Sequence, residues 1–164
     1  MNTHSHVVRL AGSEARYDNA PGDNLLRAGL RAGLGLPYEC NAGGCGSCKF
    51  ELISGEVEEL WPDAPGLNAK QRSRGHRLAC QCVPLSDCEI KIRSGEAFVP
   101  AIRPACFEVE YLGHRQVTVD IREFRFRSVE PASFLPGQYA MLELPGASQW
   151  RAYSMSNQPN AEGD

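Results

Sequence analysis

The chain has 164 residues, 23% of them charged, seven cysteines and a formal net charge of −3 at pH 7. The negative charge argues against a nucleic-acid partner, which favours basic surfaces, and no apolar run approaches the length of a membrane span. Residues 1–6 are polar and lack the apolar segment of a secretory signal, so we expect a cytoplasmic protein of one or two small domains.

The first part of the chain predicts two strands and a helix. Residues 6–10 and 14–17 read as a short hairpin around Gly12, as expected for strands joined at a glycine. Apolar residues then recur at roughly helical spacing over 25–33, with Asp23 as the expected N-cap. A glycine and a proline directly after this segment end the helix.

Three cysteines, Cys40, Cys45 and Cys48, follow in one glycine-rich loop. With Cys80 they form the spacing C-x4-C-x2-C…C, the ligand pattern of a plant-type 2Fe-2S cluster. Glycines let the backbone approach closely and turn its N–H groups toward sulfur. Structural zinc and a disulfide framework are the alternatives. Zinc sites usually pair two-cysteine knuckles, and an odd number of cysteines leaves one without a partner, so the cluster is favoured.

The segments after the loop predict further strands. Residues 49–53 alternate as a strand, and 77–82 and 88–93 read as the last two strands of this part. Strands around one packed helix indicate an α+β fold of the β-grasp type. Cys80 and Cys82 lie two residues apart on one predicted strand and so on one face, which leaves both open as the fourth ligand.

An acidic run lies between residues 50 and 69, where lysine and arginine are absent. Such a run is usually a solvated face. The alternative is a docking patch for a basic electron-transfer partner, with Trp61 as its apolar centre. The acidic residues are Glu51, Glu56, Glu58, Glu59 and Asp63.

Two prolines in residues 98–104 predict a linker between a domain at 1–97 and a second segment at 105–164. The second segment consists of strand-like runs separated by turn signals, which is typical of an antiparallel barrel or sandwich. The predicted strands are 105–112, 115–122 continuing through 124–127, and 138–145.

A possible flavin site follows these strands. Arg151 and Tyr153 alternate on one face of a predicted strand. An arginine can clamp a pyrophosphate, a tyrosine ring can stack on a flavin, and Ser154 can donate a hydrogen bond near flavin N5. The alternative is a surface strand with a chance arginine and tyrosine.

Residues 37–88 strongly resemble plant-type ferredoxin modules. In that family the first cysteine of the Leu-Ala-Cys strand is a cluster ligand, so the resemblance implies Cys80 as the fourth ligand. It leaves Cys82, Cys88 and Cys106 as small buried apolar residues or free thiols.

Pro136-Gly137-Gln138-Tyr139 and Arg151-Ala152-Tyr153-Ser154 resemble motifs of the flavin domain in the ferredoxin-NAD(P) reductase family. A ferredoxin module followed by a flavin domain resembles the reductases of bacterial multicomponent oxygenases, and 60–67 and 78–84 look most like those of toluene and related aromatic monooxygenases. The resemblance implies a β-grasp 2Fe-2S domain and the incomplete N-terminal portion of an antiparallel β-barrel FAD-binding domain. The nicotinamide domain of that family is absent, so we interpret the chain as an N-terminal fragment.

The resemblance also implies a function. Electrons would pass from NADH through FAD and the 2Fe-2S cluster to an oxygenase hydroxylase component or a Rieske ferredoxin. We assign no catalytic residue, expect a monomer, and expect the truncated chain to lack NADH oxidation. The alternative is a stand-alone 2Fe-2S ferredoxin-type electron carrier without reductase activity.

Overall fold

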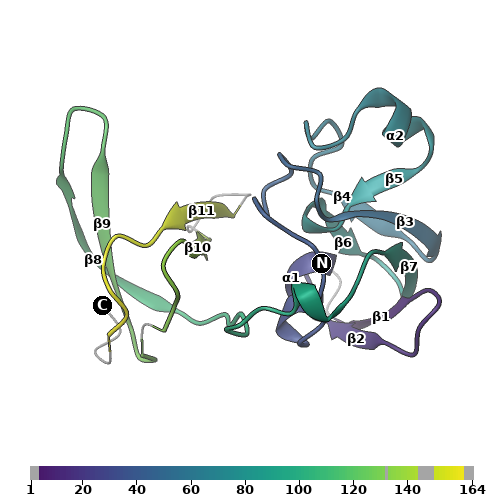
Figure 1. Ribbon diagram of the computed structural model, residues 1–164, viewed down its shortest axis with the longest axis horizontal. Coiled ribbons are helices and arrows are strands. Elements are labelled where there is room, and N and C mark those ends of the chain that lie inside the picture. The colour runs from purple at the N-terminus through teal and green to yellow at the C-terminus, as the bar shows by residue number, and fades with distance from the viewer. Residues whose placement is uncertain (1–3, 132, 144–149, 161–164) are drawn as a thin grey trace. The chain divides into compact units, whose positions relative to one another are not determined.

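The computed structural model describes residues 4–131, 133–143 and 150–160, and the chain divides into two compact units, Met1–Pro104 and Ala105–Asp164 (Figure 1). Three parts of the sequence-based predictions lie outside the described residues: the polar start at 1–3, the strand end at 144–145, and the end of the second segment at 161–164. Within the described ranges, no helix is both long enough and apolar enough to cross a membrane.

A five-stranded mixed sheet frames the first unit, in the order β2-β1-β7-β3-β5 (Figure 1). β1 and β7 are parallel and the other neighbours are antiparallel. The strand that comes last in the sequence therefore lies at the centre of the sheet. The strands are β1 His6–Leu10, β2 Arg16–Asn19, β3 Lys49–Ser54, β5 His76–Leu78 and β7 Cys88–Ile92.

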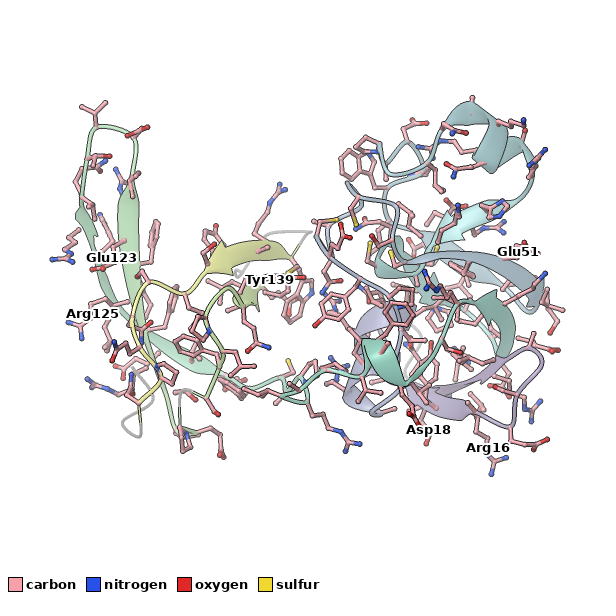
Figure 2. All side chains as sticks on the ribbon, in the orientation of Figure 1. Arg16, Asp18, Glu51, Glu123, Arg125 and Tyr139 are labelled. Atoms are coloured by element: carbon pink, nitrogen blue, oxygen red, sulfur yellow. The ribbon has the colours of Figure 1, made fainter. Side chains whose placement is uncertain are left out.

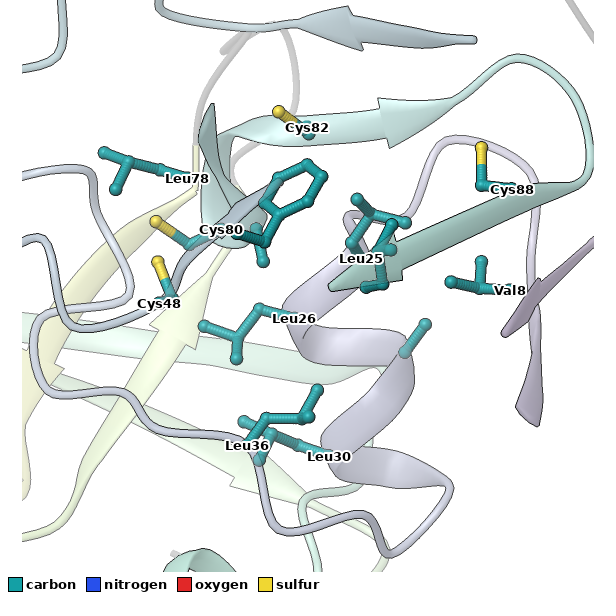
Figure 3. Close-up of a cluster of buried hydrophobic side chains, with 14 of the residues drawn as sticks. Val8, Leu25, Leu26, Leu30, Leu36, Cys48, Leu78, Cys80, Cys82 and Cys88 are labelled. Carbon is teal, nitrogen blue, oxygen red and sulfur yellow. The ribbon is translucent and has the colours of Figure 1, made fainter. Parts of the chain in front are cut away.

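The helix α1, Leu25–Arg31, packs its apolar face into the core of this unit. Figure 3 shows Leu25 and Leu26 from α1 beside the buried cysteines. The expected N-cap was wrong by one residue, because the Asn24 side chain caps the helix by accepting a hydrogen bond from the Arg27 N–H. Asp23 instead pairs its carboxylate with Arg27 and Arg31.

Short elements between β3 and β7 differ from the expected pattern. A second small sheet joins β4, Val57–Glu59, to β6, Cys82–Pro84. The helix α2, Ala69–Ser73, starts at a capping box formed by Asn68 and Gln71. The segment predicted as one strand at 77–82 is divided by the 3-10 helix η1, Ala79–Gln81. A further 3-10 helix, η2, spans Glu96–Phe98 at the start of the predicted linker.

The second unit consists of two antiparallel strand pairs. β8, Val109–Gln116, pairs with β9, Arg122–Ser128, and β10, Tyr139–Leu142, pairs with β11, Arg151–Ser154. The prediction of a strand over 115–122 was wrong, because the chain reverses there. Thr118 supports the turn, since its Oγ accepts from the Ile121 N–H and donates to Asp120.

Burial differs sharply between the units. The first unit has a continuous apolar core, whereas none of the described residues of 105–160 is buried. Figure 2 shows side chains projecting from both faces of the β8–β9 hairpin, including Glu123 and Arg125. The α+β prediction is confirmed, and its helical and buried part lies in the first unit.

The burial contrast predicts how the two units respond to truncation of an aromatic side chain. Phe50 is 1% exposed in β3, so Phe50→Ala should lower the free energy of unfolding by about 3–5 kcal/mol, the usual cost of removing a buried phenylalanine. Phe124 in β9 is 44% exposed and provides the matched control. Urea unfolding of the full chain, followed by circular dichroism, measures both. Equal losses for the two variants would contradict this assignment of the core.

Candidate metal centre

The cysteine loop between α1 and β3 directs backbone N–H groups at sulfur. Cys40 Sγ accepts from the N–H groups of Ala42, Gly44 and Cys45 at 3.4, 3.2 and 3.3 Å. Cys45 Sγ accepts from the Ser47 N–H at 3.4 Å. Backbone donors arranged in this way favour negative charge, so the loop suits thiolates.

The loop packs directly on the backbone of residues 64–67. The Gly66 N–H donates to the Gly43 carbonyl at 2.9 Å. A Cβ at Gly46 would lie 2.4 Å from the Gly66 carbonyl oxygen, closer than real atoms approach. Gly43 and Gly46 also have positive φ angles, of 83° and 78°. Both the close approach and the backbone conformation therefore require glycine here.

Arg72 from α2 holds the segment that covers the loop. Its guanidinium donates to the carbonyl oxygens of Pro62 and Ala64. Ala64 is buried, and its Cβ would lie 3.1 Å from a Cβ at Gly43. A side chain on α2 thus fixes the backbone that packs against the cysteine loop.

Cys80 reaches this loop from the 3-10 helix η1. The Ala79 N–H donates to the Cys48 carbonyl at 3.0 Å, which brings the two cysteine-bearing segments together. Cys48 and Cys80 are both buried, and Figure 3 shows their sulfur atoms side by side. The Asn24 side chain donates to the Cys80 carbonyl at 2.9 Å from the start of α1.

The Cys82 side chain does not point in the same direction as that of Cys80, contrary to the expectation that the two cysteines share one face. The strand argument was wrong because η1 turns the backbone between the two residues. Cys82 begins β6, and its sulfur points away from Cys48 and Cys80 (Figure 3). The burial of Cys82, with the nearby charge of Glu59, raises the pKa of its thiol, so this cysteine stays protonated.

The electrostatics of the other thiols differ from those of Cys82. A hydrogen bond between the Cys48 and Cys80 side chains lowers the pKa of Cys80 to about 7 and, together with burial, raises the pKa of Cys48. Cys80 is therefore the thiol of this pair that ionises more readily. Burial opposes ionisation of Cys45, but hydrogen bonds from Cys40 and Ser47 outweigh it and lower the Cys45 pKa. Metal binding requires such deprotonated cysteines.

The donors form two neighbouring pairs, and this arrangement fits a two-iron cluster. Cys40 and Cys45 are hydrogen-bonded neighbours, as are Cys48 and Cys80. In the described part of the chain, no group of three or more cysteine, histidine or acidic side chains gathers closely enough for a single metal ion. Zinc needs its four donors around one point, whereas two irons can each take one pair of thiolates.

The remaining cysteines have other surroundings. All seven cysteines are free thiols, so no disulfide framework exists in this structure. Cys88 is buried at the start of β7, and its thiol donates to the carbonyl oxygens of Glu56 and Ser86. Cys106 is exposed in the second unit.

The acidic run of 51–63 is partly neutralised within the chain. Glu51 lies 3.7 Å from Lys91 and 3.6 Å from His76, and Glu59 pairs with Arg77 at 3.0 Å. The exposed acids of this run are Glu56, Glu58 and Asp63, and the adjacent Leu60 and Trp61 are also exposed.

The flavin candidates lie together on β11 of the second unit. Arg151, Tyr153 and Ser154 are all exposed. Alternation along the strand puts Arg151 and Tyr153 on one face, and Ser154 pairs with Tyr139 of β10, which Figure 2 labels. Arg151 and Tyr153 therefore share one exposed face of β11, and the Ser154 side chain lies on the other.

Sequence reasoning did not assign a role at the site to Asn24 or Arg72. Asn24 directly precedes an apolar helical run, which is the position of an N-cap residue. The pattern Asn68-x-x-Gln71 has the spacing of a capping box and predicts the start of α2. These signals identify the helix starts, but they carry no information on contacts with the cysteine loop.

Comparisons with known proteins find a domain family and several relatives. Residues 8–85 match the 2Fe-2S iron-sulfur cluster binding domain family. The ferredoxin–NAD(P)(+) reductase CarAd of Metapseudomonas resinovorans is 49% identical over 146 residues, which are 87% of this chain and 44% of that protein. The xylene/toluene monooxygenase electron transfer component XylA of Pseudomonas putida is 35% identical over 96% of this chain and 44% of its own length.

A solved structure described as the ferredoxin reductase in carbazole 1,9a-dioxygenase has a TM-score of 0.93 and 41% identity. The match covers 99% of this chain and 51% of the solved chain. The chain thus spans less than half the length of the two curated relatives above. Over most of its length, it is similar to the reductase and electron transfer components named above, and residues 8–85 match the 2Fe-2S domain family.

Proposed function

We propose that this chain is part of a reductase that transfers electrons from NADH, through FAD and a 2Fe-2S cluster, to an oxygenase component or a Rieske ferredoxin of an aromatic monooxygenase system. Cys40, Cys45, Cys48 and Cys80 hold the cluster. One observation carries the proposal: the Cys48 and Cys80 side chains, from distant parts of the chain, are hydrogen-bonded to each other. In the same loop as Cys48, the sulfur atoms of Cys40 and Cys45 accept hydrogen bonds from backbone N–H groups.

Each part of the chain has a separate task in this proposal. A bound 2Fe-2S cluster accepts and releases one electron at a time. The loop N–H groups stabilise charge on the thiolate of Cys40. The segment held by Arg72 packs against Gly43 and Gly46 of the loop. On β11, Arg151 would bind the pyrophosphate of FAD, Tyr153 would stack on the flavin, and Ser154 would donate a hydrogen bond to it.

The partner docks next to the cysteine loop. Trp61 is 41% exposed, and a Cβ at Gly43 of the loop would lie 3.3 Å from its ring. The exposed acids Glu58 and Asp63 lie close to Trp61 in the sequence, which favours an apolar centre with a negative rim here. A partner with basic groups around an apolar patch fits such a surface.

The thiol arrangement predicts the metal content of the purified chain. We expect a red-brown protein with about two irons and two acid-labile sulfides per chain and a midpoint potential of about −400 mV. Metal analysis, sulfide analysis and spectroelectrochemistry measure these quantities. Stoichiometric zinc without labile sulfide would refute the cluster.

The different directions of Cys80 and Cys82 predict different effects of the same substitution. Cys80→Ser should abolish or strongly destabilise the cluster, since it removes a thiol that meets Cys48. Cys82→Ser is the matched control, because Cys82 is equally buried but its sulfur points away. The visible spectrum and iron content report the outcome. A cluster retained in Cys80→Ser and lost in Cys82→Ser would reverse the ligand assignment.

The open surface of the second unit predicts weak flavin binding by this 164-residue chain. Its flavin candidates on β11 are exposed and no described residue of the unit is buried, so FAD would remain largely solvated. We expect the chain to lose FAD on dialysis, to show no NADH oxidation, and to behave as a simple electron carrier. Flavin fluorescence after dialysis and a diaphorase assay test this. Near-stoichiometric retained FAD, or rapid reduction of the cluster by NADH, would show that the unit is sufficient by itself.

A further inference from the structure

Asn24 is a buried polar residue at the start of α1. Its side chain is 2% exposed, and among the described residues only Asn19 and Asn24 are polar and buried. A polar group removed from water in this way is costly unless it is hydrogen-bonded. The contacts of Asn24 therefore account for its presence in an apolar core.

The oxygen and the nitrogen of the Asn24 side-chain amide form hydrogen bonds with two segments that are far apart in the sequence. Oδ1 accepts from the Arg27 N–H at 2.8 Å and so caps α1. Nδ2 donates to the Cys80 carbonyl at 2.9 Å, across 56 residues of sequence. One side chain thus ties the start of the helix to the backbone of a cysteine that we assign to the cluster.

The backbone around Cys80 is held by hydrogen bonds to residues outside its own turn. It lies in η1, a single 3-10 turn without a side-chain cap. The Ala79 N–H is held by the Cys48 carbonyl, and the Cys80 carbonyl is held by Asn24. These two hydrogen bonds hold the Leu78–Ala79 peptide and the Cys80–Gln81 peptide, so they restrain the backbone that carries the Cys80 side chain.

We propose that Asn24 is a positioning residue for the cluster, which aims the Cys80 thiol at Cys48 from the capped end of α1. The inference rests on the proposed role of Cys80 as a ligand. The Asn24 amide can perform both tasks because it carries an acceptor and a donor on separate atoms. Serine and aspartate cap helices well, but an ionised aspartate cannot donate, and the shorter serine does not extend as far as the Nδ2 position.

Substitutions that keep the cap and remove the donor test the inference. Asn24→Ser and Asn24→Asp are prepared as the full chain with its cluster. We expect cluster loss to an iron chelator to be about 10–100-fold faster, as is typical when outer-shell partners of a metal site are removed. The midpoint potential and the EPR line shape of the reduced cluster should also change, because the sulfur direction changes. Two variants are used so that one can be measured if the other fails to fold.

Asn19→Ser is the matched control. Asn19 is equally buried, and its Nδ2 donates to the carbonyls of Ala20 and Asp23, in the turn before α1, rather than to a cysteine carbonyl. This variant should lower the melting temperature while keeping the wild-type chelation rate, potential and EPR spectrum. If Asn24→Ser and Asn19→Ser lose the cluster equally fast and both keep the wild-type potential, Asn24 is merely structural and the inference is overturned.

Cys80→Ser separates this inference from the proposed function. If Cys80→Ser keeps the wild-type cluster spectrum, the ligand assignment is wrong, and the inference is overturned with it. If Cys80→Ser loses the cluster while both Asn24 variants match the wild type in chelation rate and potential, only the positioning role is refuted.

Discussion

The cysteine loop has its shape because two stretches of backbone pack together with no side chain between them. Gly43 and Gly46 on one side meet Gly66 on the other, at distances that leave no room for a Cβ. This contact turns the loop inward and aims its N–H groups at Cys40. Arg72 of α2 maintains this contact, because its guanidinium donates hydrogen bonds to the backbone of the segment that packs on the loop.

The two units differ in how their strands are packed: the first has a buried apolar core, and the described residues of the second are not buried. In the first unit, a helix, a mixed sheet and the cysteine-bearing turns share one apolar core, so that the thiols are attached to the most stable part of the molecule. The second unit consists of paired strands with exposed faces, in which aromatic contacts such as that between Tyr111 and Phe126 lie at the surface. Strand pairs of this kind are marginal without further packing.

Local patterns in the sequence predicted the features that depend on local chemistry. Cysteine spacing located the loop, and alternation located β3 and β7. The 3-10 turn at Cys80 was not predictable, because it depends on contacts with Cys48 and Asn24, which are far away in the sequence. The helix cap was missed by one residue because aspartate and asparagine are both good caps. The reversal at Thr118 was hidden by the β-branched residues around it.

The central place of β7 in the sheet has a consequence for biosynthesis. A chain emerges from the ribosome N-terminus first, and β7 follows all four candidate ligands in the sequence. Until β7 is made, β1 and β3 have no common neighbour, and the sheet stays in two parts. The four candidate ligands are therefore synthesised before the strand that joins the two parts of the sheet.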